Sequence, residues 1–143
     1  MMHDGKQVDF AASAPTIPPM AFCDDKTTVM ELRRLVRSFV DEREWRKYHQ
    51  PKNLSMSLAV ETAELMEHFQ WLNHSQSRRL LKNPRTRRMV ADEMADVLAF
   101  LLSLANAAGI DIAASFEAKM ESNRRKYPAG RVRGRKYRKP GRR

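Results

Sequence analysis

The sequence has few of the features on which several protein classes depend. Its 143 residues include one cysteine, Cys23, so no internal disulfide can form, and no metal-ligand pattern surrounds this thiol. No apolar run approaches the roughly 20 residues that a membrane-crossing helix needs, and the first ten residues carry acids where a signal peptide would be hydrophobic. We therefore expect a soluble, cytoplasmic protein with no membrane partner.

Glycine is also scarce, with five residues, and alternating runs of valine, isoleucine and threonine are few. Leucine, methionine and alanine are frequent instead, and hydrophobic residues make up 42% of the chain. This composition favours helices over sheets. Because 143 residues suffice for one domain with a core but not for two of ordinary size, we predict a single all-α domain.

Acidic residues are absent from positions 124–143, which hold 11 of the 27 lysines and arginines. The formal net charge of +10 is thus concentrated at the C-terminal end, and the rest of the chain is nearly neutral. The other end contains the proline-rich stretch AASAPTIPPM, which lacks helical periodicity. We accordingly predict three parts: a flexible N-terminal arm (1–26), an all-α domain (27–128) and a basic C-terminal tail (129–143).

Apolar periodicity predicts four principal helices in the central part. A capping box at Thr28, an asparagine–proline start at Asn83, a left-handed stop at Gly109 and a capping side chain at Asp111 mark their ends. The expected helices span about 28–48, 54–72, 84–108 and 111–127. A short helical turn is expected within SQSRRLLKN, between the second and third of them.

Two of these helices carry carboxylates beside their apolar stripes. Glu61 falls within the stripe of the second helix and Glu64 follows three residues on, while Glu93 and Asp96 repeat the arrangement on the third helix. The stripes themselves consist of Leu54, Leu58, Leu65, Phe69 and Leu72, and of Val90, Met94, Val97, Leu101 and Leu104.

Converging carboxylates repel one another unless cations join them. Their hard oxygens suit Mg²⁺ or Mn²⁺, whereas a di-iron centre would need Glu-x-x-His on two helices, which is missing here. The alternative is that the four acids merely solvate exposed helix faces. We predict a Mg²⁺ site, with Mn²⁺ as a possible substitute.

The spacing Glu61-x-x-Glu64 followed by Glu93-x-x-Asp96 resembles the E-x-x-E…E-x-x-D metal motif of the all-α MazG-like pyrophosphohydrolases. The likeness covers about 27–128 and includes the segments HQPKNL, FQW and KMESNRRKYP, which are similar to the dCTP pyrophosphatase branch. It implies a four-helix bundle-like MazG fold and a homo-oligomer, either a dimer or a tetramer.

The resemblance also implies an activity: Mg²⁺-dependent hydrolysis of a nucleoside triphosphate to a monophosphate and pyrophosphate, which cleanses the nucleotide pool. The favoured substrate is dCTP or a modified dCTP. Catalytic and metal-binding roles are implied for Glu61, Glu64, Glu93 and Asp96. Substrate contacts are implied for Trp45, His49, Asn53 and Trp71 near the nucleoside, and for Lys119, Asn123, Arg124 and Tyr127 near the phosphates or the pocket wall.

Two departures from the family pattern concern the site. The typical G-E-V-G-E-L run is Val60-Glu-Thr-Ala-Glu-Leu65 here, so that both glycines are replaced while the acids stay. Phe100 stands where the family often has tyrosine and cannot offer a hydroxyl to substrate. We therefore expect the metal role and the type of reaction to be kept, whereas the resemblance supports the substrate preference less firmly than the type of reaction.

The basic tail allows three interpretations: a solvated end, a segment that closes over the triphosphate, or a nonspecific nucleic-acid contact. The sequence also allows two other functions. The protein could be a nucleic-acid-binding helical module that uses this tail, although no base-reading motif is present, or a nonenzymatic helical adaptor. Either alternative predicts no Mg²⁺-dependent release of pyrophosphate.

Overall fold

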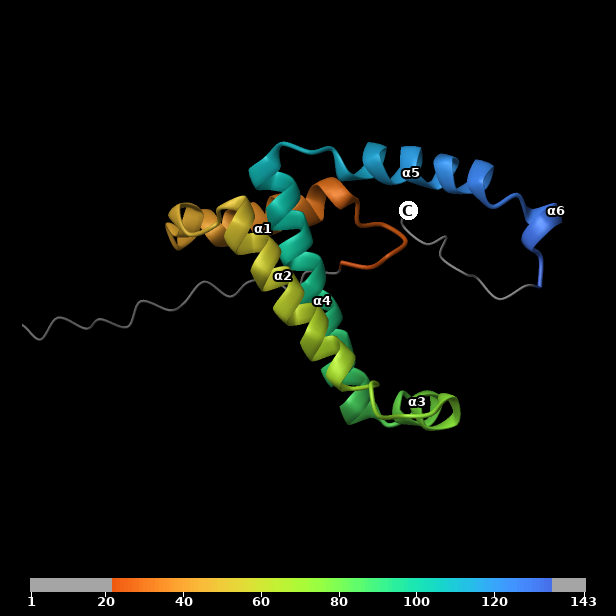
Figure 1. The fold of residues 1–143 in the computed structure, drawn as a ribbon. Helices are drawn as coiled ribbons and strands as arrows, with labels where there is room; N and C mark the ends of the chain where they lie inside the picture. Colours follow the sequence, from red (N-terminus) through yellow and green to blue (C-terminus); the bar gives the residue numbers. More distant parts are fainter. Residues whose placement is uncertain (1–21, 135–143) are drawn as a thin grey trace, which may run out of the picture.

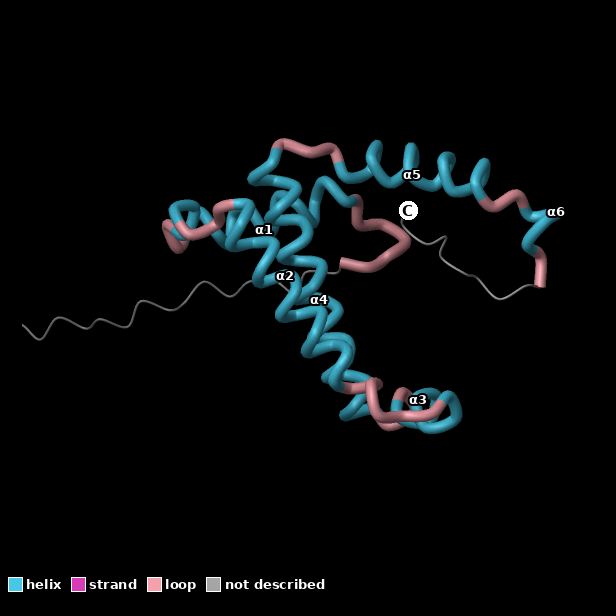
Figure 2. Tube along the Cα trace, in the orientation of Figure 1, coloured by secondary structure: helices cyan, strands magenta, loops and turns pink. Residues whose placement is uncertain are grey.

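A computed structural model describes residues 22–134, and all regular structure in this range is helical (Figures 1 and 2). The predicted all-α class is confirmed, as are four principal helices. Residues 1–21 of the predicted arm and 135–143 of the tail lie outside the described residues. In chain order the elements are α1 (Val29–Glu42), the 3₁₀ turn η1 (Trp45–Lys47), α2 (Pro51–Glu67), α3 (His74–Leu80), α4 (Pro84–Ala108), α5 (Ile112–Lys126) and α6 (Ala129–Val132).

The capping side chains act as predicted. The Thr28 hydroxyl accepts from the Glu31 amide at 3.2 Å, and the Glu31 carboxylate accepts from the Thr28 amide at 2.7 Å. The Asn83 side chain accepts two amide hydrogen bonds at the start of α4, and the Asp111 side chain accepts one at the start of α5. Gly109 ends α4 with φ of 64°, a conformation that favours glycine.

Three helix boundaries differ from the prediction. The first helix ends at Glu42 instead of continuing to about 48, because Glu44 has a left-handed φ of 53° and the chain turns there into η1. The second helix begins at Pro51, earlier than expected, because proline at the first helical position lacks only an amide hydrogen that has no partner there anyway. It also ends earlier, at Glu67 instead of about 72.

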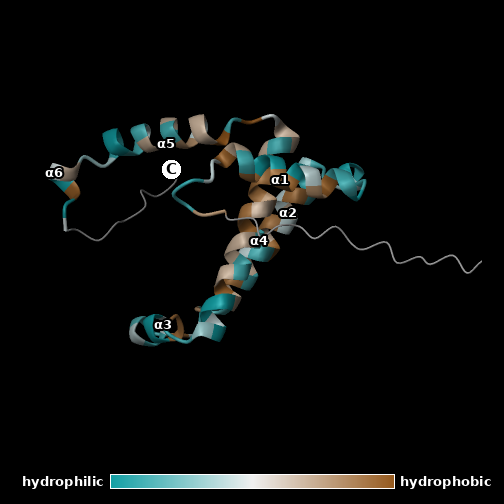
Figure 3. Ribbon diagram, turned by 180° about the vertical axis from the view of Figure 1, so that it is seen from behind, coloured by the Kyte–Doolittle hydropathy of each residue, from teal (hydrophilic) through white to brown (hydrophobic). Residues whose placement is uncertain are grey.

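The core forms where α1, α2 and α4 meet. Helices α2 and α4 run side by side along most of their length in opposite directions, and α1 lies across the C-terminal part of α4 (Figure 1). Figure 3 shows hydrophobic residues gathered along these three helices. The most buried apolar side chains are Val40, Leu54, Val90, Leu102 and Ala105.

The predicted apolar stripe of α4 is wrong in part. Met94 is 58% exposed and Leu101 is 36% exposed, whereas Leu102 and Ala105 are buried. The buried face is therefore rotated by about one residue toward the C-terminal end of α4, because this end packs against α1 as well as α2. This rotation of the buried face matters for function, since it determines which polar residues of α4 face the interior.

Helix α5 extends away from the other three long helices (Figure 1) and makes few contacts with them. Its Phe116 is 67% exposed. No single helix in the described part is long and apolar enough to span a bilayer; α4 and α5 meet that criterion only as a joined pair bent by 104°. Within one chain the bundle therefore consists of three packed helices and a fourth that stands apart.

Candidate metal centre and neighbouring cavity

Three carboxylates converge between α2 and α4. One oxygen each of Glu61, Glu64 and Glu93 can be chosen so that all three lie within 4.8 Å of one another. Helix α2 presents the two glutamates one turn apart on one side, and the antiparallel neighbour α4 brings Glu93 to the same level. The spacing seen in the sequence is thus converted into a single cluster that spans two helices.

Asp96 borders this cluster without belonging to its closest part. Its charge is near enough to act on Glu61, yet the Asp96 side chain is exposed, and its oxygens are not among the three converging ones. Glu61 and Glu93 are half-buried, whereas Glu64 is exposed. The predicted sheltered flank is therefore only partly sheltered in a single chain, because α2 and α4 cover each other on one side only.

The electrostatics of the cluster are unfavourable without a cation. Loss of hydration raises the pKa of Glu61 above its ordinary value, and the neighbouring charges of Glu64, Asp96 and Glu93 raise it further. A raised carboxyl pKa means that the folded chain resists the ionised form. A divalent cation would reverse this preference by offering each carboxylate an opposite charge.

The donor chemistry fits Mg²⁺. The three converging groups are all carboxylates, which are hard ligands, and the exposed side of Glu64 leaves room for water or phosphate oxygens to complete an octahedron. Within the described residues, neither α2 nor α4 adds a histidine or cysteine to the cluster of Glu61, Glu64 and Glu93. The composition of the site thus favours a cation that is held partly by protein and partly by substrate.

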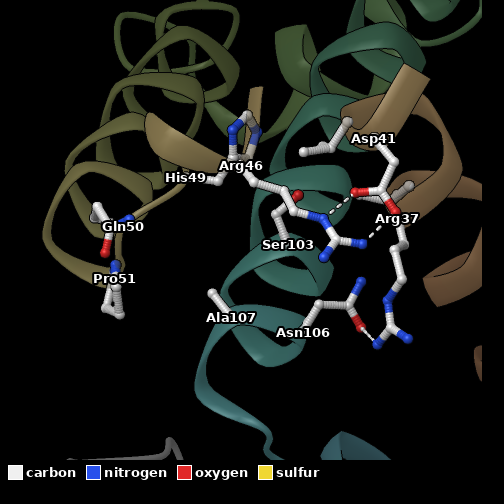
Figure 4. A pocket seen from close by; sticks show the side chains of 11 residues that line it. Arg37, Asp41, Arg46, His49, Gln50, Pro51, Ser103, Asn106 and Ala107 are labelled. Atoms are coloured by element: carbon white, nitrogen blue, oxygen red, sulfur yellow. Dashed lines mark hydrogen bonds and ion pairs between the residues drawn. The ribbon is translucent and has the colours of Figure 1, made fainter. Parts of the chain in front are cut away.

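A cavity of about 380 Å³ lies beside the C-terminal part of α4 (Figure 4). Its position follows from helix geometry: Ser103, which lines it, stands seven residues after Asp96, which is about two turns and roughly 10 Å along the same helix face. The other lining residues come from α1, η1 and the start of α2: Val36, Arg37, Val40, Asp41, Arg46, His49, Gln50 and Pro51, with Asn106 and Ala107 from α4.

Two groups of hydrogen bonds shape the wall of the cavity. Arg46 and Asp41 form a two-bonded ion pair, of which one bond measures 2.6 Å, and this partner holds the pKa of Asp41 below its ordinary value. On α4, the side-chain carbonyl of Asn106 accepts from the Arg33 side chain at 2.9 Å and from the Arg37 side chain at 3.4 Å. The side-chain amide of Asn106 donates to the main-chain carbonyl of Arg33 at 3.0 Å. The Asn106 bonds thus join α1 to α4, and the ion pair joins η1 to α1.

Three of the predicted nucleoside contacts lie at this end of the protein. His49 lines the cavity, and its Nδ1 is 2.9 Å from the Trp45 carbonyl oxygen. Trp45 itself is 43% exposed and meets Phe39 edge-to-face with ring centroids 6.0 Å apart. Asn53 donates to the Tyr48 carbonyl at 3.1 Å, so its amide steadies the turn that precedes α2.

The other predicted nucleoside contact lies far from these three. Trp71 follows the C-terminal end of α2, whereas Trp45 precedes its N-terminal end, and the 17 residues of α2 span about 25 Å. Trp71 is also 86% exposed. The two indoles of one chain therefore cannot enclose the same base.

The predicted phosphate contacts on and after α5 also stand apart from the carboxylates, because α5 extends away from α2 and α4 (Figure 1). Arg124 lies 3.4 Å from the Glu121 carboxylate on its own helix, and the Tyr127 amide donates to the Asn123 carbonyl at 2.8 Å. Lys119 is exposed and Asn123 is half-buried. A single chain thus does not bring these four residues to the metal cluster.

Sequence reasoning missed the polar residues of α4 that line the cavity. Ser103 and Asn106 interrupt the otherwise apolar segment 97–108, three residues apart and hence on the same side of the helix. Polar residues in an apolar helical segment are candidates for packed hydrogen bonds or ligand contacts, and this signal was present in the sequence. Asp41 and Arg46, five residues apart, had no helical spacing that would have paired them.

Comparison with known proteins agrees with this geometry. The sequence profile of the MazG-like family matches residues 56–138, which include all four acids of the predicted metal site. The chain belongs to the MazG-like family. It is 35% identical over 131 residues to dCTP pyrophosphatase 1 of Rattus norvegicus, covering 92% of this chain and 74% of the relative.

Two further similarities extend the comparison. The dCTP pyrophosphatase 1 of Bos taurus is 36% identical over 116 residues, which cover 81% of this chain and 68% of the relative. A crystal structure of a pyrophosphatase from Archaeoglobus fulgidus superposes with a TM-score of 0.65 and 44% identity, covering 69% of this chain and 91% of that one. The similarity thus includes both sequence and fold.

Proposed function

We propose that this protein hydrolyses a nucleoside triphosphate to a nucleoside monophosphate and pyrophosphate in a Mg²⁺-dependent reaction, with dCTP or a modified dCTP as the favoured substrate. The observation that carries the proposal is the convergence of Glu61, Glu64 and Glu93 within 4.8 Å in a MazG-like chain. Relatives named dCTP pyrophosphatase 1 support the choice of substrate. The reaction would remove unwanted nucleotides from the cytoplasmic pool.

The residues divide the work between the two halves of the site. Glu61, Glu64 and Glu93, with Asp96 beside them, would hold the metal and act as the catalytic carboxylates, and bound Mg²⁺ would neutralise the phosphate charge. Water attacks the α phosphorus, the bond from this phosphorus to the oxygen that bridges the α and β phosphates breaks, and pyrophosphate leaves. A carboxylate of the cluster that is not engaged by the metal can accept the proton of the water.

The nucleoside would occupy the cavity beside the metal centre. The cavity has the size usual for small-molecule sites and lies about two helical turns from Asp96 along α4. Trp45 and Asn53 do not line the cavity themselves, but the Trp45 main-chain carbonyl is bonded to His49, which does, and Asn53 is bonded to the main-chain carbonyl of the preceding residue, Tyr48. A nucleoside triphosphate lying along α4 can therefore place its base in the cavity and its phosphates at the carboxylates.

The active unit would be a homo-oligomer, a dimer or a tetramer. Trp71 is 86% exposed, Phe116 is 67% exposed, and α5 leaves its own chain without covering the core. Large exposed aromatic side chains of this kind usually mark an interface. A second copy would bring Trp71 and the α5 residues Lys119, Asn123 and Arg124 toward a site that one chain leaves incomplete.

Product identification tests the proposed reaction. The full chain is incubated with Mg²⁺ and a set of deoxynucleoside and ribonucleoside triphosphates, and the products are separated by anion-exchange chromatography. Monophosphate with pyrophosphate, absent when the metal is chelated, supports the proposal. Diphosphate with orthophosphate, or no hydrolysis of any member of the set, overturns it.

A further inference from the structure

The turn between α3 and α4 carries the densest positive charge in the described part of the chain. Six of the eleven residues 78–88 are arginine or lysine, and no acidic residue occurs between Glu67 and Asp92. Figure 3 shows α3 and the first turns of α4 mainly in the hydrophilic colour. The six cations form what we name the basic corner: Arg78 and Arg79 at the end of α3, Lys82 in the turn, and Arg85, Arg87 and Arg88 at the start of α4.

The cations of the basic corner are exposed and almost without counter-charges. Arg88 pairs with Asp92 at 2.9 Å, but within residues 22–134 the other five side chains have neither an ion pair nor a hydrogen bond. On α5, by contrast, Arg124 and Arg125 both lie against the carboxylate of Glu121. Like charges that are gathered and not neutralised repel one another, so an anionic partner would relieve this repulsion.

Hydrogen bonds across the turn give the basic corner a fixed shape. The Thr86 hydroxyl donates to the Leu80 carbonyl at 2.6 Å, which joins the start of α4 to the end of α3. The Asn83 side chain accepts from the Arg85 amide at 2.9 Å and from the Thr86 amide at 3.3 Å. The backbone that carries the cations is thus already ordered, and a preorganised surface loses less conformational freedom when it binds.

The basic corner surrounds a hollow of about 570 Å³. Apolar and cationic residues alternate around it: Leu81, Lys82, Pro84, Arg87, Arg88 and Ala91. Such a lining can receive a partner that has both an apolar face and a regular negative charge. A sugar–phosphate backbone has these two properties in every unit.

The basic corner is separate from the metal centre of the same chain. At about 100° per residue, the residues of α4 that line the hollow lie within about 50° of one direction, whereas Glu93 lies about 170° from it. The cations and the carboxylate cluster therefore occupy opposite sides of α4. A triphosphate at the carboxylates of one chain does not neutralise the basic corner of that chain, which remains available to another anion.

Among large anions, a nucleic acid matches the basic corner best. It has a negative charge on every nucleotide, so a short length of backbone can face all six cations. Five of the six are arginines, whose planar guanidinium groups form paired hydrogen bonds with phosphate oxygens. A lipid surface fits less well, because α3 has seven residues and the corner is hollow, whereas membrane-binding helices lay a longer apolar face on a flat surface.

We propose that the basic corner binds the phosphodiester backbone of a nucleic acid without reading its bases. Phosphate contacts supply affinity independently of sequence, so no base-reading motif is required. This binding surface goes beyond the proposed hydrolysis and does not depend on it. It also differs from a contact made by the C-terminal tail, because its residues belong to α3, α4 and the turn between them.

The salt dependence of binding tests the proposal. Binding of a fluorescent oligonucleotide, as a single strand or as a duplex, is followed by anisotropy at several KCl concentrations. The full chain is compared with a triple variant, Lys82→Gln, Arg85→Gln and Arg87→Gln. Each lost phosphate contact lowers the slope of log K against log salt by about 0.9 for a duplex and about 0.7 for a single strand.

The triple variant should therefore lose about 2 or more from this slope. At about 0.1 M salt the same loss corresponds to an affinity that is lower by at least about 100-fold. Comparison of the strand with the duplex identifies the preferred form. The thermal midpoint should not fall, because the three replaced side chains are exposed and unbonded within the described residues. Should the triple variant unfold, each single substitution must still lower the slope by about 0.7 to 0.9.

A charge-matched variant separates the basic corner from net charge. Lys26→Gln, Arg34→Gln and Lys52→Gln remove the same number of charges from exposed positions that belong to neither α3 nor α4. This control should bind the oligonucleotide with nearly the slope and affinity of the unaltered protein. If the control loses as much as the corner variant, the effect is due to net charge and the proposal is wrong.

Three other outcomes overturn the proposal. The first is that neither oligonucleotide binds at low salt. The second is that the corner variant binds like the unaltered protein, which would place the contact elsewhere, as in the basic tail. The third is that polyglutamate or vesicles of anionic lipid bind more tightly than either oligonucleotide and lose this binding in the corner variant. None of these results depends on whether a triphosphate is hydrolysed, so the proposed function is tested separately.

Discussion

Replacement of Glu61 by glutamine removes one negative charge from the carboxylate cluster and keeps the length of the side chain. Two unit charges 4.8 Å apart repel by about 0.9 kcal/mol in a water-like dielectric and by about 3.5 kcal/mol at an effective dielectric constant of about 20. Glu61 is half-buried, so its interactions fall between these limits. Summed over Glu64 and Glu93, the water limit predicts that at least about 1.7 kcal/mol of repulsion is relieved at low ionic strength.

The metal-free variant should therefore be more stable than the unaltered protein, by several degrees in thermal midpoint. The effect depends on pH with a defined sign. Because the folded chain raises the pKa of Glu61, the contribution of this group to stability is fully present below the ordinary glutamate pKa and is lost as pH rises through the raised value. Glu61→Gln lacks this ionisation, so the two proteins should differ at neutral pH and converge in acid.

Mg²⁺ should reverse the order. Its binding stabilises the unaltered protein at neutral pH, where the three carboxylates are ionised, and it should stabilise Glu61→Gln much less because one ligand charge is missing. The assay is thermal unfolding followed by circular dichroism at fixed protein concentration, with EDTA or with MgCl₂. Turnover of the variant should fall by at least about 100-fold, the loss typical for removal of one preorganised electrostatic group.

Glu67→Gln is the matched control for this experiment. Glu67 is on the same helix, α2, but it is exposed and is not among the converging carboxylates. It should keep the stabilisation by Mg²⁺ and the turnover. If Glu61→Gln keeps both as well, or if chelation lowers turnover equally little in all three proteins, the carboxylate cluster is not the metal centre and the reasoning fails.

Three further predictions address the remaining parts of the structure. Asn106→Ala should lower the free energy of unfolding by about 2 kcal/mol, measured by urea denaturation, because it removes three hydrogen bonds that join α1 to α4, two of them partly buried. Asp41→Asn should lower the thermal midpoint at neutral pH but not in strong acid, because the lowered pKa of Asp41 stabilises the fold above the ordinary aspartate pKa and this stabilisation is lost as pH falls through the lowered value. Trp71→Ala should leave the thermal midpoint of a dilute sample unchanged, since the indole is 86% exposed, but should raise the KM for the triphosphate if a second copy receives this side chain.

The positions of the helices could be predicted from local chemistry. Thr28, Asn83 and Asp111 each satisfy amides at a helix start through side-chain oxygens two or three residues away, so the signal and its effect are both local. Glu44 illustrates the limit, because nothing in its residue type announces a left-handed conformation. The end of α1 is set by the ion pair and turn around η1, which involve residues that have no helical spacing.

The convergence of carboxylates between α2 and α4 was predictable for a similar reason, and the cavity was not. Glu61 and Glu64 share a helix face at any spacing of three or four residues, and so do Glu93 and Asp96, so only the pairing of two helices had to be assumed. The cavity requires the segment 36–51, which includes parts of α1, η1 and α2, to lie against the distant C-terminal part of α4. Its existence depends on where α1 crosses α4, a packing detail that periodicity does not encode.

Helix α5 shows the physical limit of a prediction based on one chain. Its sequence predicts a helix with a capping residue and a proline-delimited end, and the structure has that helix at Ile112–Lys126. Its packing partner, however, is determined by a complementary surface and not by periodicity, and within the described residues α5 makes few contacts with α1, α2 and α4. Exposed Phe116 on α5 and exposed Trp71 after α2 therefore point to the same cause. The proposed homo-oligomer would account for both, because a second copy of the chain would supply the tertiary packing on which a single helix in water depends.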